Sequence, residues 1–268
     1  MKKLLLLIIA PLAFFAAVQA QITPIVTQAE ADGIVLERLN KETQSSTVYL
    51  KEGLPEKMMI TSSAGEQIEL NYLCRVYYIR YTDTNQGRYL IVNVNNGNLL
   101  EVNIKSDTEP VDMMEKWRIE APVKEISFTE YVLESPSCRW IQSYYNRPPG
   151  YDYSFGSEVV VINNNEELEK NVTCQKDGFG NCINPCVFYS TIDFSKYTLL
   201  LAHGVEPYQN RPVYTGLQQL STQSYVMRIR FNPSGLAALL YWQVPILVSK
   251  IADGSTIEVI CTFNRFNR

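Results

Sequence analysis

Six cysteines and one histidine are the residues of this chain whose types suggest chemistry. Three cysteines, Cys174, Cys182 and Cys186, fall in one stretch, TCQKDGFGNCINPC (173–186). Zinc sites usually take closely spaced cysteine pairs, and here only Asp177 offers a further ligand. Three residues separate Cys182 from Cys186, so the stretch also lacks the Cys-x-x-Cys spacing of a redox motif. The pattern favours disulfides over a metal site.

Three is an odd number, so at least one of these cysteines must pair outside the stretch or stay free. We expect a Cys138–Cys174 bond, together with a Cys182–Cys186 bond that closes a small ring. Six cysteines allow fifteen complete pairings, so other connectivities stay open. The remaining two, Cys74 and Cys261, each lie in an apolar predicted strand and are expected to be buried free thiols, with a bond between them as the alternative.

His203 is the only histidine of the chain. A single histidine excludes HExxH-type zinc sites, and there is no GxSxG, GxGxxG, P-loop or EF-hand motif. His203 follows an apolar run, LLLAHG, where a structural role at the end of a strand is favoured over catalysis. Glu166, Glu167 and Glu169 are explained by the exposed face of a short helix. We therefore predict no catalytic residue, no metal and no cofactor, and keep an unrecognised hydrolase as the less favoured alternative.

The stretch SYYNRPPGYDYSFG (143–156) combines aromatic residues with arginine and a Pro-Pro pair. Tyrosine and arginine are favoured at binding hot spots, and aromatic faces also stack on sugar rings. The candidate binding residues are Tyr144, Tyr145, Arg147, Tyr151, Tyr153 and Phe155. The alternative is a loop whose tyrosines pack back onto the sheet.

The first 20 residues, MKKLLLLIIAPLAFFAAVQA, have the features of a secretory signal peptide. Lys2 and Lys3 precede an apolar run that is too short to span a membrane, and Val18 and Ala20 form a small-residue cleavage site. We expect cleavage after Ala20 and export from a bacterial cell to the periplasm or the exterior. Both compartments are oxidising, which fits the disulfides.

The chain has 24 basic and 28 acidic residues, and loss of Lys2 and Lys3 makes the net charge of the mature chain −6. Arg228 and Arg230 could line one face of a strand, but a solvated face explains them. With no basic patch, binding to nucleic acid is not expected. No transmembrane segment is expected either, because no later stretch is long and apolar enough to be one.

The fold class expected from the patterns is α+β, in two domains. The segment 26–40 is a predicted helix with a capping box at Thr27 and Glu30. Short predicted strands follow, and the NNGN sequence at 95–98 favours a hairpin turn. Residues 21–120 are thus expected to form a helix-plus-antiparallel-meander domain, and a charged, proline-containing segment (105–125) interrupts the strand pattern near the boundary.

Residues 121–268 are expected to form a β-rich antiparallel domain with one short helix, which Asn164 caps. The stretch VYTGLQQLSTQSYVMRIRFN predicts a hairpin. Its second strand places Tyr225, Met227, Ile229 and Phe231 on one face, because successive side chains of a strand alternate. In the last predicted strand the same alternation makes Cys261 face the core.

Three stretches of the second half, VVVINNNEELEKNV, IDFSKYTLLLAHG and WQVPILVSKI, resemble the PrcB-type C-terminal domain over about residues 155–252. This chain departs from the family pattern in two ways: it has an insertion at 174–186, and it lacks the Gly-Gly-Tyr sequence often seen after the buried strand. The resemblance implies a non-catalytic β-rich module of a protein complex. The first half is similar, more weakly, to PepSY-like and cystatin-like secreted modules, which suggests inhibition or protein binding.

The sequence therefore predicts a secreted protein-binding module, either inhibitor-like or a subunit that stabilises a complex. A glycan-binding protein that uses residues 143–156 is the alternative. If the cysteine-rich stretch takes part, we expect it to present a binding surface with residues 176–179 at its tip.

Overall fold

The computed structural model describes residues 26–82, 84, 86–105, 110, 112–141, 157–177, 179–187, 190–206, 212–232 and 240–263. Of the described residues, 53% lie in strands and 9% in helices. The protein is therefore mostly β, with antiparallel sheets and an N-terminal helix, as the sequence patterns predict. The expected signal peptide (1–20) lies outside the described residues.

Helix α2 (Gln28–Leu39) begins at the predicted capping box. Thr27 Oγ1 accepts a hydrogen bond from the backbone N–H of Glu30 at 3.2 Å, and the Glu30 carboxylate accepts one from the backbone N–H of Thr27 at 2.8 Å. Both bonds satisfy groups that have no partner within the helix. The buried residues of α2 include Asp32 as well as apolar residues such as Leu36, so the helix is enclosed by other elements rather than lying on the surface.

A five-stranded antiparallel sheet in the order β6-β5-β4-β1-β7 packs on α2. Its strands are β1 (Ser46–Lys51), β4 (Cys74–Tyr81), β5 (Gln86–Asn93), β6 (Leu99–Lys105) and β7 (Met113–Ile119). The hairpin of β2 (Met58–Thr61) and β3 (Gln67–Leu70) packs on the sheet with Cys74, Val76, Ile91 and Val102. Strand β7 falls in the charged segment 105–125, where the sequence pattern gives no strand, because Glu115, Lys116 and Arg118 interrupt its apolar residues.

Two four-stranded sheets form the second half of the chain. One has the order β17-β15-β14-β8 and the other the order β11-β13-β16-β9. The first contains β8 (Lys124–Glu125), β14 (Pro212–Ser221), β15 (Ser224–Phe231) and β17 (Thr256–Phe263), and the second contains β9 (Phe128–Glu130), β11 (Ser157–Ile162), β13 (Tyr197–Glu206) and β16 (Leu240–Ser249). Their facing side chains share one core, so the two sheets form a sandwich.

The predicted hairpin of β14 and β15 is confirmed, and Tyr225, Met227, Ile229 and Phe231 face the core of the sandwich. Cys261 of β17 faces the same core, and neither Cys261 nor Cys74 takes part in a disulfide. The antiparallel pattern expected for the second half is wrong at its end, because β17 pairs with β15 in parallel. Strand β16 belongs to the other sheet, so the turn at 252–255 joins two sheets and not two strands of a hairpin.

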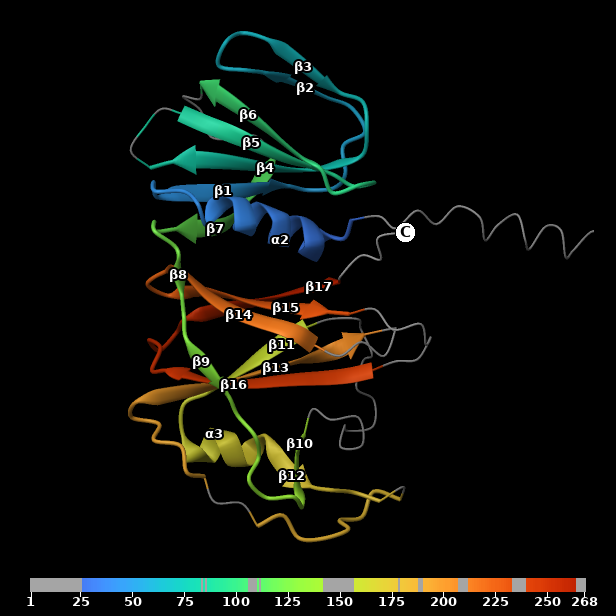
Figure 1. Cartoon of the computed structure of the whole chain (residues 1–268), viewed down its shortest axis with the longest axis vertical. Coiled ribbons are helices and arrows are strands. Elements are labelled where there is room, and N and C mark those ends of the chain that lie inside the picture. The colour runs from blue at the N-terminus through green and yellow to red at the C-terminus, as the bar shows by residue number, and fades with distance from the viewer. Residues whose placement is uncertain are drawn as a thin grey trace, which may run out of the picture.

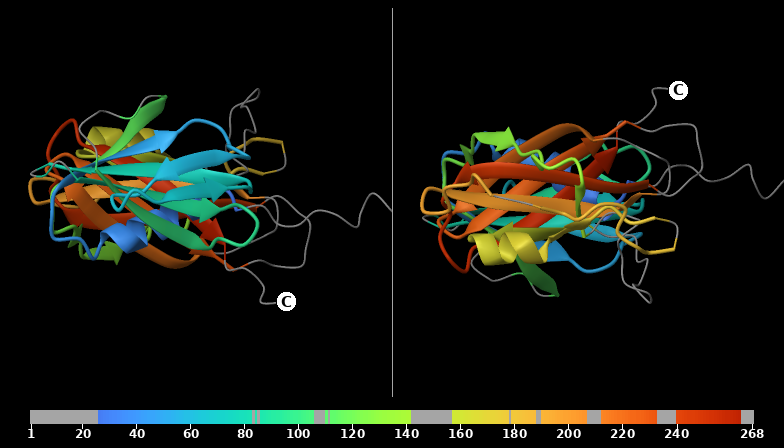
Figure 2. Two further views of the ribbon diagram at one scale, coloured as in Figure 1. Left: turned by 90° about the horizontal axis from the view of Figure 1, so that it is seen from above. Right: turned by 90° about the horizontal axis from the view of Figure 1, so that it is seen from below.

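The elements stack along the long axis of the molecule, from the β2–β3 hairpin at one end to helix α3 (Asn165–Lys170) at the other (Figure 1). Figure 2 shows the same stack from its two ends. Asn164 caps α3 as predicted, and its side chain accepts a hydrogen bond from the backbone N–H of Glu167 at 2.8 Å. Helix α3 contributes Leu168 to a cluster on the outer face of β11 and β13, together with Trp140 of the short strand β10 (Cys138–Trp140).

Helix α2 lies between the first sheet and the sandwich. Its cluster of buried side chains includes Val48 and Trp117 from the first sheet and Leu220, Val226 and Ile260 from the sandwich. The Cα of Gly33 comes so close to β17 that an added Cβ would lie 3.2 Å from Thr262 Cγ2. The halves on either side of residue 120 thus share buried apolar surface, and their division into two domains stays a prediction.

Charged side chains join the same three elements beside this apolar cluster. Lys116 Nζ of β7 lies 3.1 Å from Asp32 Oδ2 of α2 and 3.0 Å from Glu258 Oε1 of β17. Tyr77 donates a hydrogen bond to Asp32 Oδ1 at 2.6 Å. Burial raises the pKa of Asp32 above its ordinary value, although Lys116 and Tyr77 act in the opposite direction.

Candidate binding surface

Two disulfides hold residues 175–187, which we call the cysteine loop, against β10 and the strand β12 (Val172–Cys174). Cys138 pairs with Cys186 across a Cα–Cα distance of 4.9 Å, and Cys174 pairs with Cys182 across 5.5 Å. The prediction that these four cysteines form disulfides is confirmed.

The predicted pairing of Cys138 with Cys174 and of Cys182 with Cys186 is wrong. Cys138 and Cys174 do lie opposite each other, in the antiparallel pair of β10 and β12. The cysteine loop turns back on itself, however, and a bridge between Lys176 and Cys182 brings Cys182 close to Cys174. Each strand cysteine is therefore bonded to a cysteine of the loop and not to the cysteine of the neighbouring strand.

Asp177 organises the tip of the cysteine loop. Its Oδ1 accepts hydrogen bonds from the backbone N–H groups of Phe179 and Asn181, each at 2.9 Å. The bond from Asn181 is the largest cause that lowers the pKa of Asp177, so the carboxylate stays charged and keeps these bonds at neutral pH. Below the tip, Ile183 donates its backbone N–H to Gln175 O at 2.8 Å. The turn is thus fixed by its own hydrogen bonds as well as by the disulfides.

Three apolar side chains of the cysteine loop face solvent. Phe179 is 93% exposed, Val187 58% and Ile183 53%. Phe179 lies at the tip of the loop, where the sequence analysis expects residues 176–179. An exposed phenylalanine leaves a large apolar area in water, and its neighbours in the loop do not cover it.

Arg139 of β10 connects the base of the cysteine loop to a neighbouring groove. Its guanidinium donates to Pro136 O and Cys138 O, each at 2.7 Å, and to Gln175 Oε1 at 3.0 Å. Gln175 is the first residue of the cysteine loop, so these bonds help to fix where the loop leaves the strands.

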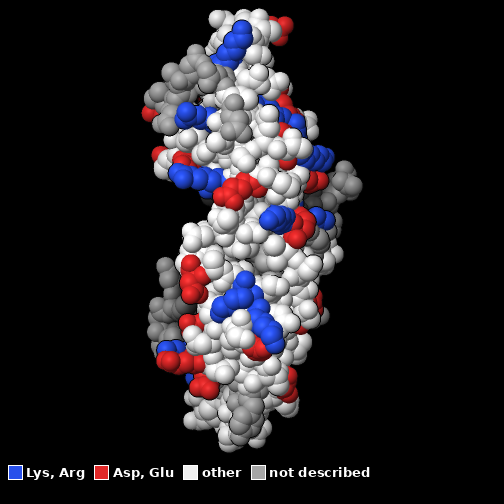
Figure 3. All heavy atoms as spheres, turned by 90° about the vertical axis from the view of Figure 1, so that its left-hand side faces the viewer, with Lys and Arg blue, Asp and Glu red and all other residues white. Residues whose placement is uncertain are grey.

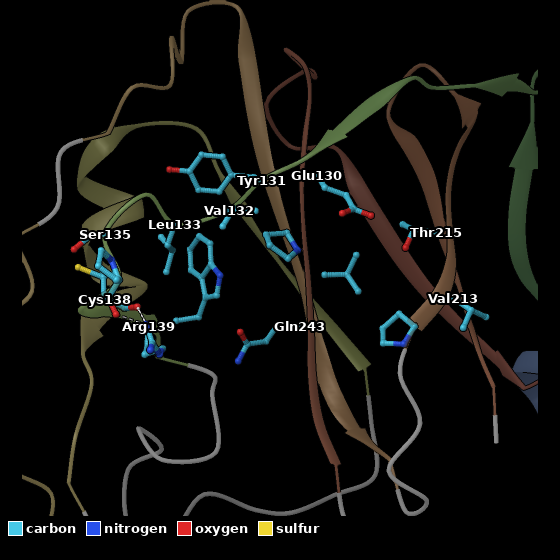
Figure 4. A pocket seen from close by; sticks show the side chains of 15 residues that line it. Glu130, Tyr131, Val132, Leu133, Ser135, Cys138, Arg139, Val213, Thr215 and Gln243 are labelled. Carbon is cyan, nitrogen blue, oxygen red and sulfur yellow. Dashed lines mark hydrogen bonds between the residues drawn. The ribbon is translucent and has the colours of Figure 1, made fainter. Parts of the chain in front are cut away.

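The groove has a volume of about 660 Å³ and lies between the segment 130–140, the start of β14 and the middle of β16 (Figure 4). Its lining residues are Glu130, Tyr131, Val132, Leu133, Ser135, Pro136, Cys138, Arg139, Trp140, Pro212, Val213, Thr215, Gln243, Val244 and Pro245. Most are apolar or uncharged, and among these described lining residues Glu130 is the one carboxylate. The cysteine loop and the groove meet at Cys138 and Arg139.

Two sheet edges border the groove. Strand β16 pairs with β9 only at Ile246–Val248, and Tyr131 donates its N–H to Pro245 O at 3.0 Å just beyond that pairing. Strand β14 pairs with β8 only at Gln218 and Gln219. Alternate residues of a strand direct their backbone N–H and C=O groups to the same side. Gln243 lies two residues before Pro245, and Thr215 lies two residues before Leu217, which accepts from Ile126 N–H. The backbone groups of Gln243 and Thr215 are therefore directed toward the groove. No described strand pairs with β14 or β16 there.

His203 lies within β13, which continues to Glu206, and not at the end of a strand as the sequence suggested. It is buried and pairs in register with Glu158 on β11 and Gln243 on β16. The distance from His203 Nε2 to Glu158 Oε2 is 3.9 Å, which is longer than a hydrogen bond.

The predicted aromatic binding residues Tyr144, Tyr145, Arg147, Tyr151, Tyr153 and Phe155 lie outside the described residues, so that hypothesis stays a prediction. Arg228 is half-buried and Arg230 is exposed, as a solvated face requires. They line a hollow of about 270 Å³ with Glu30 and Glu37 of α2.

Acidic and basic side chains lie close to one another on the face shown in Figure 3. The described part of the chain holds no group of three or more side chains suited to binding a metal ion. Within the same part, no helix has the length and apolar character needed to cross a membrane. The two disulfides indicate an oxidising environment outside the cytoplasm.

Comparisons with family models, with curated proteins and with solved structures gave no match to this chain. The resemblances to PrcB-type and PepSY-like modules therefore stay predictions.

Proposed function

We propose that this protein is an exported, non-catalytic module that binds another protein through the cysteine loop. The observation that carries the proposal is the position of Phe179, which is 93% exposed at the tip of a loop that two disulfides attach to the sandwich. Aromatic side chains are favoured at binding hot spots, because they bury much area and lose little conformational entropy.

The order of the loop before binding supports the same proposal. A loop that must become ordered on binding loses conformational entropy, and a loop that is already ordered avoids this cost. Here the Asp177 carboxylate binds the backbone N–H groups of Phe179 and Asn181, and the Cys174–Cys182 bond closes the turn. The shape of a protruding phenylalanine, with Ile183 and Val187 also exposed, suits a partner with a complementary apolar pocket.

The groove offers the partner a second, concave contact beside the loop. An extended peptide can add to a sheet edge by main-chain hydrogen bonds, while side-chain pockets give specificity. The open edges at Thr215 and Gln243 provide such groups, and Val132 and Val213 provide exposed apolar contact. We propose that an extended segment of the same partner lies here.

Two features of the sequence agree with this function. The predicted signal peptide agrees with export, and the disulfides agree with an oxidising compartment, where a surface held by disulfides persists. The resemblance of the second half to PrcB-type modules suggests a subunit of a protein complex, which is a binding role.

Comparative capture tests the proposal. The mature chain would be immobilised as wild type, as Phe179→Ala and as Met59→Ala, and the proteins retained from the culture fluid and envelope extract of its source would be quantified by mass spectrometry. Met59 is 55% exposed on β2, at the far end of the molecule, and so is a matched control. We expect a protein that the wild type and Met59→Ala retain equally and that Phe179→Ala retains at least tenfold less. Equal retention by all three variants would contradict the proposal.

A further inference from the structure

The four disulfide-bonded cysteines lie in a geometry that allows a second pairing. Gln175 donates its backbone N–H to Ser137 O at 3.0 Å, so 137 and 175 are a hydrogen-bonded pair of the β10–β12 ladder. The next pair, Cys138 with Cys174, is therefore of the non-hydrogen-bonded kind. In such pairs the Cα atoms lie about 4.5 Å apart, at the short end of the range of about 4.4–6.8 Å that disulfides span. A Cys138–Cys174 bond is therefore compatible with the usual strand spacing of such a pair.

The cysteines also differ in access to solvent. Cys138 and Cys174 are buried at 1% and 5% exposure, whereas Cys182 is exposed and Cys186 is half-buried. An external thiol can thus reach Cys182 more readily than the two strand cysteines. Disulfide exchange proceeds by attack of a thiolate on an accessible sulfur, so exchange would begin at the Cys174–Cys182 bond.

We propose that these four cysteines form a thiol-exchange switch that holds the cysteine loop in one of two disulfide pairings. The co-reactant is a thiol of the glutathione type or the active-site thiol of a disulfide isomerase. Its thiolate attacks Cys182 Sγ and forms a mixed disulfide, and the electron pair of the broken bond leaves on Cys174 Sγ.

The Cys174 thiolate then attacks Cys138 Sγ across the ladder. This step forms the Cys138–Cys174 bond and breaks the Cys138–Cys186 bond, leaving Cys186 as a thiolate. Cys186 attacks Cys182 Sγ, which closes the Cys182–Cys186 bond and releases the external thiolate unchanged. Two disulfides are present before and after, so no oxidant or reductant is consumed.

The exchange changes how the loop is attached to the protein. In the structure each disulfide joins the cysteine loop to a strand. In the second pairing one bond joins the strands to each other and the other closes a small ring within the loop. No disulfide would then join the loop to a strand, and hydrogen bonds such as those of Gln175 to Arg139 and to Ser137 O would hold its base. That consequence for binding rests on the proposed function, whereas the exchange itself does not.

Tryptic mapping without reduction distinguishes the pairings by mass. Trypsin places Cys138 on residues 125–139, Cys174 on 171–176, and both Cys182 and Cys186 on 177–196. The pairing in the structure links all three peptides. The second pairing links 125–139 to 171–176 and leaves 177–196 alone with an internal bond.

The experiment incubates the folded mature chain in a buffer of reduced and oxidised glutathione, quenches with acid and follows both products over time. We expect the linked triplet to fall and the two separate products to rise, with an unchanged number of free thiols. The variant Cys182→Ser/Cys186→Ser should form the Cys138–Cys174 bond under the same conditions. Wild-type protein that keeps the triplet alone, or a folded double variant in which Cys138 and Cys174 stay reduced, would overturn the proposal. The readout needs no partner, so it can fail while the proposed function stands.

Discussion

The carboxylate of Glu258 accepts a hydrogen bond from the indole Nε1 of Trp117 at 2.6 Å. This bond joins β17, the last strand of the chain, to β7 of the first sheet. Lys116 lies between the same carboxylate and Asp32, so the two halves of the chain meet through a charged network as well as through α2. Both halves should therefore respond when one member of the network is changed.

Glu258→Ala should lower the free energy of unfolding by about 1–3 kcal/mol, because it leaves the indole N–H of the buried Trp117 without this acceptor. Lys116 keeps Asp32 as a partner in this variant, which limits the loss. Urea unfolding monitored by tryptophan fluorescence would measure it. Glu115→Ala is the control, since Glu115 pairs with the exposed Arg118, and removing such a pair costs about 0–1 kcal/mol. Equal losses in the two variants would contradict the assigned role of Glu258.

Asp32 predicts a particular dependence of stability on pH. Burial raises the pKa of its carboxyl in the folded state above the value in the unfolded chain. The folded state then binds the proton more tightly, so this group favours folding more as the pH falls through the folded pKa. Relative to Asp32→Asn, wild-type stability should rise between neutral pH and about pH 4. A constant difference between the two proteins over that range would contradict burial as the dominant cause.

Gly87 should tolerate no side chain. A Cβ at this position would lie 2.4 Å from Tyr78 Oη and 2.5 Å from Tyr78 Cε2, and the Tyr78 ring is itself buried. Gly87→Ala should therefore destabilise the protein by about 1–3 kcal/mol, the usual cost of overpacking. In a Tyr78→Leu background the same change should cost less, and a double-mutant cycle would measure this coupling. Additive effects would show that the ring is not the cause.

Removing the two disulfides, one at a time, should lower the free energy of unfolding by different amounts. The Cys138–Cys186 bond joins residues 48 apart and the Cys174–Cys182 bond joins residues 8 apart. In the loop-entropy model, the free energy of unfolding should fall by about 4 kcal/mol in Cys138→Ser/Cys186→Ser. It should fall by about 2.5 kcal/mol in Cys174→Ser/Cys182→Ser. Urea unfolding of both double variants would test the order, and a larger loss for the shorter loop would contradict it.

Local signals in the sequence predict the local structure well. The capping box at Thr27 and Glu30, the Asn164 cap and the alternation in β15 each depend on residues close together in the chain. All three are present in the structure. The pairing of β17 with β15 depends instead on which distant strands share an edge, and no local pattern encodes that choice.

The structural features that the sequence patterns did not predict mostly involve charged residues. Strand β7 has charged side chains at several outward positions, so its alternation is hidden, and Asp32 on a helix suggests an exposed site. Its burial depends on Lys116 from β7 and Tyr77 from β4, which only the fold brings together. No signal in a single sequence identifies such a network.

The candidate site was predicted in part. The disulfides of the cysteine loop were predicted from the sequence, because three closely spaced cysteines in a chain expected to be exported favour disulfides. The groove could not be predicted, since its residues come from the segment 130–140 and from β14 and β16. The pairing of the cysteines could not be predicted either, because it depends on the loop folding back between Lys176 and Cys182.

Site-specific photo-crosslinking tests the central claim most directly. A benzophenone amino acid would replace Phe179 in one variant and Met59 in another, and each variant would be irradiated with the protein that the wild type captures. We predict that the probe at 179 forms a crosslink to an apolar surface of that protein and that the probe at 59 forms none. Crosslinking at 59 with none at 179 would contradict the assignment of the cysteine loop as the binding surface.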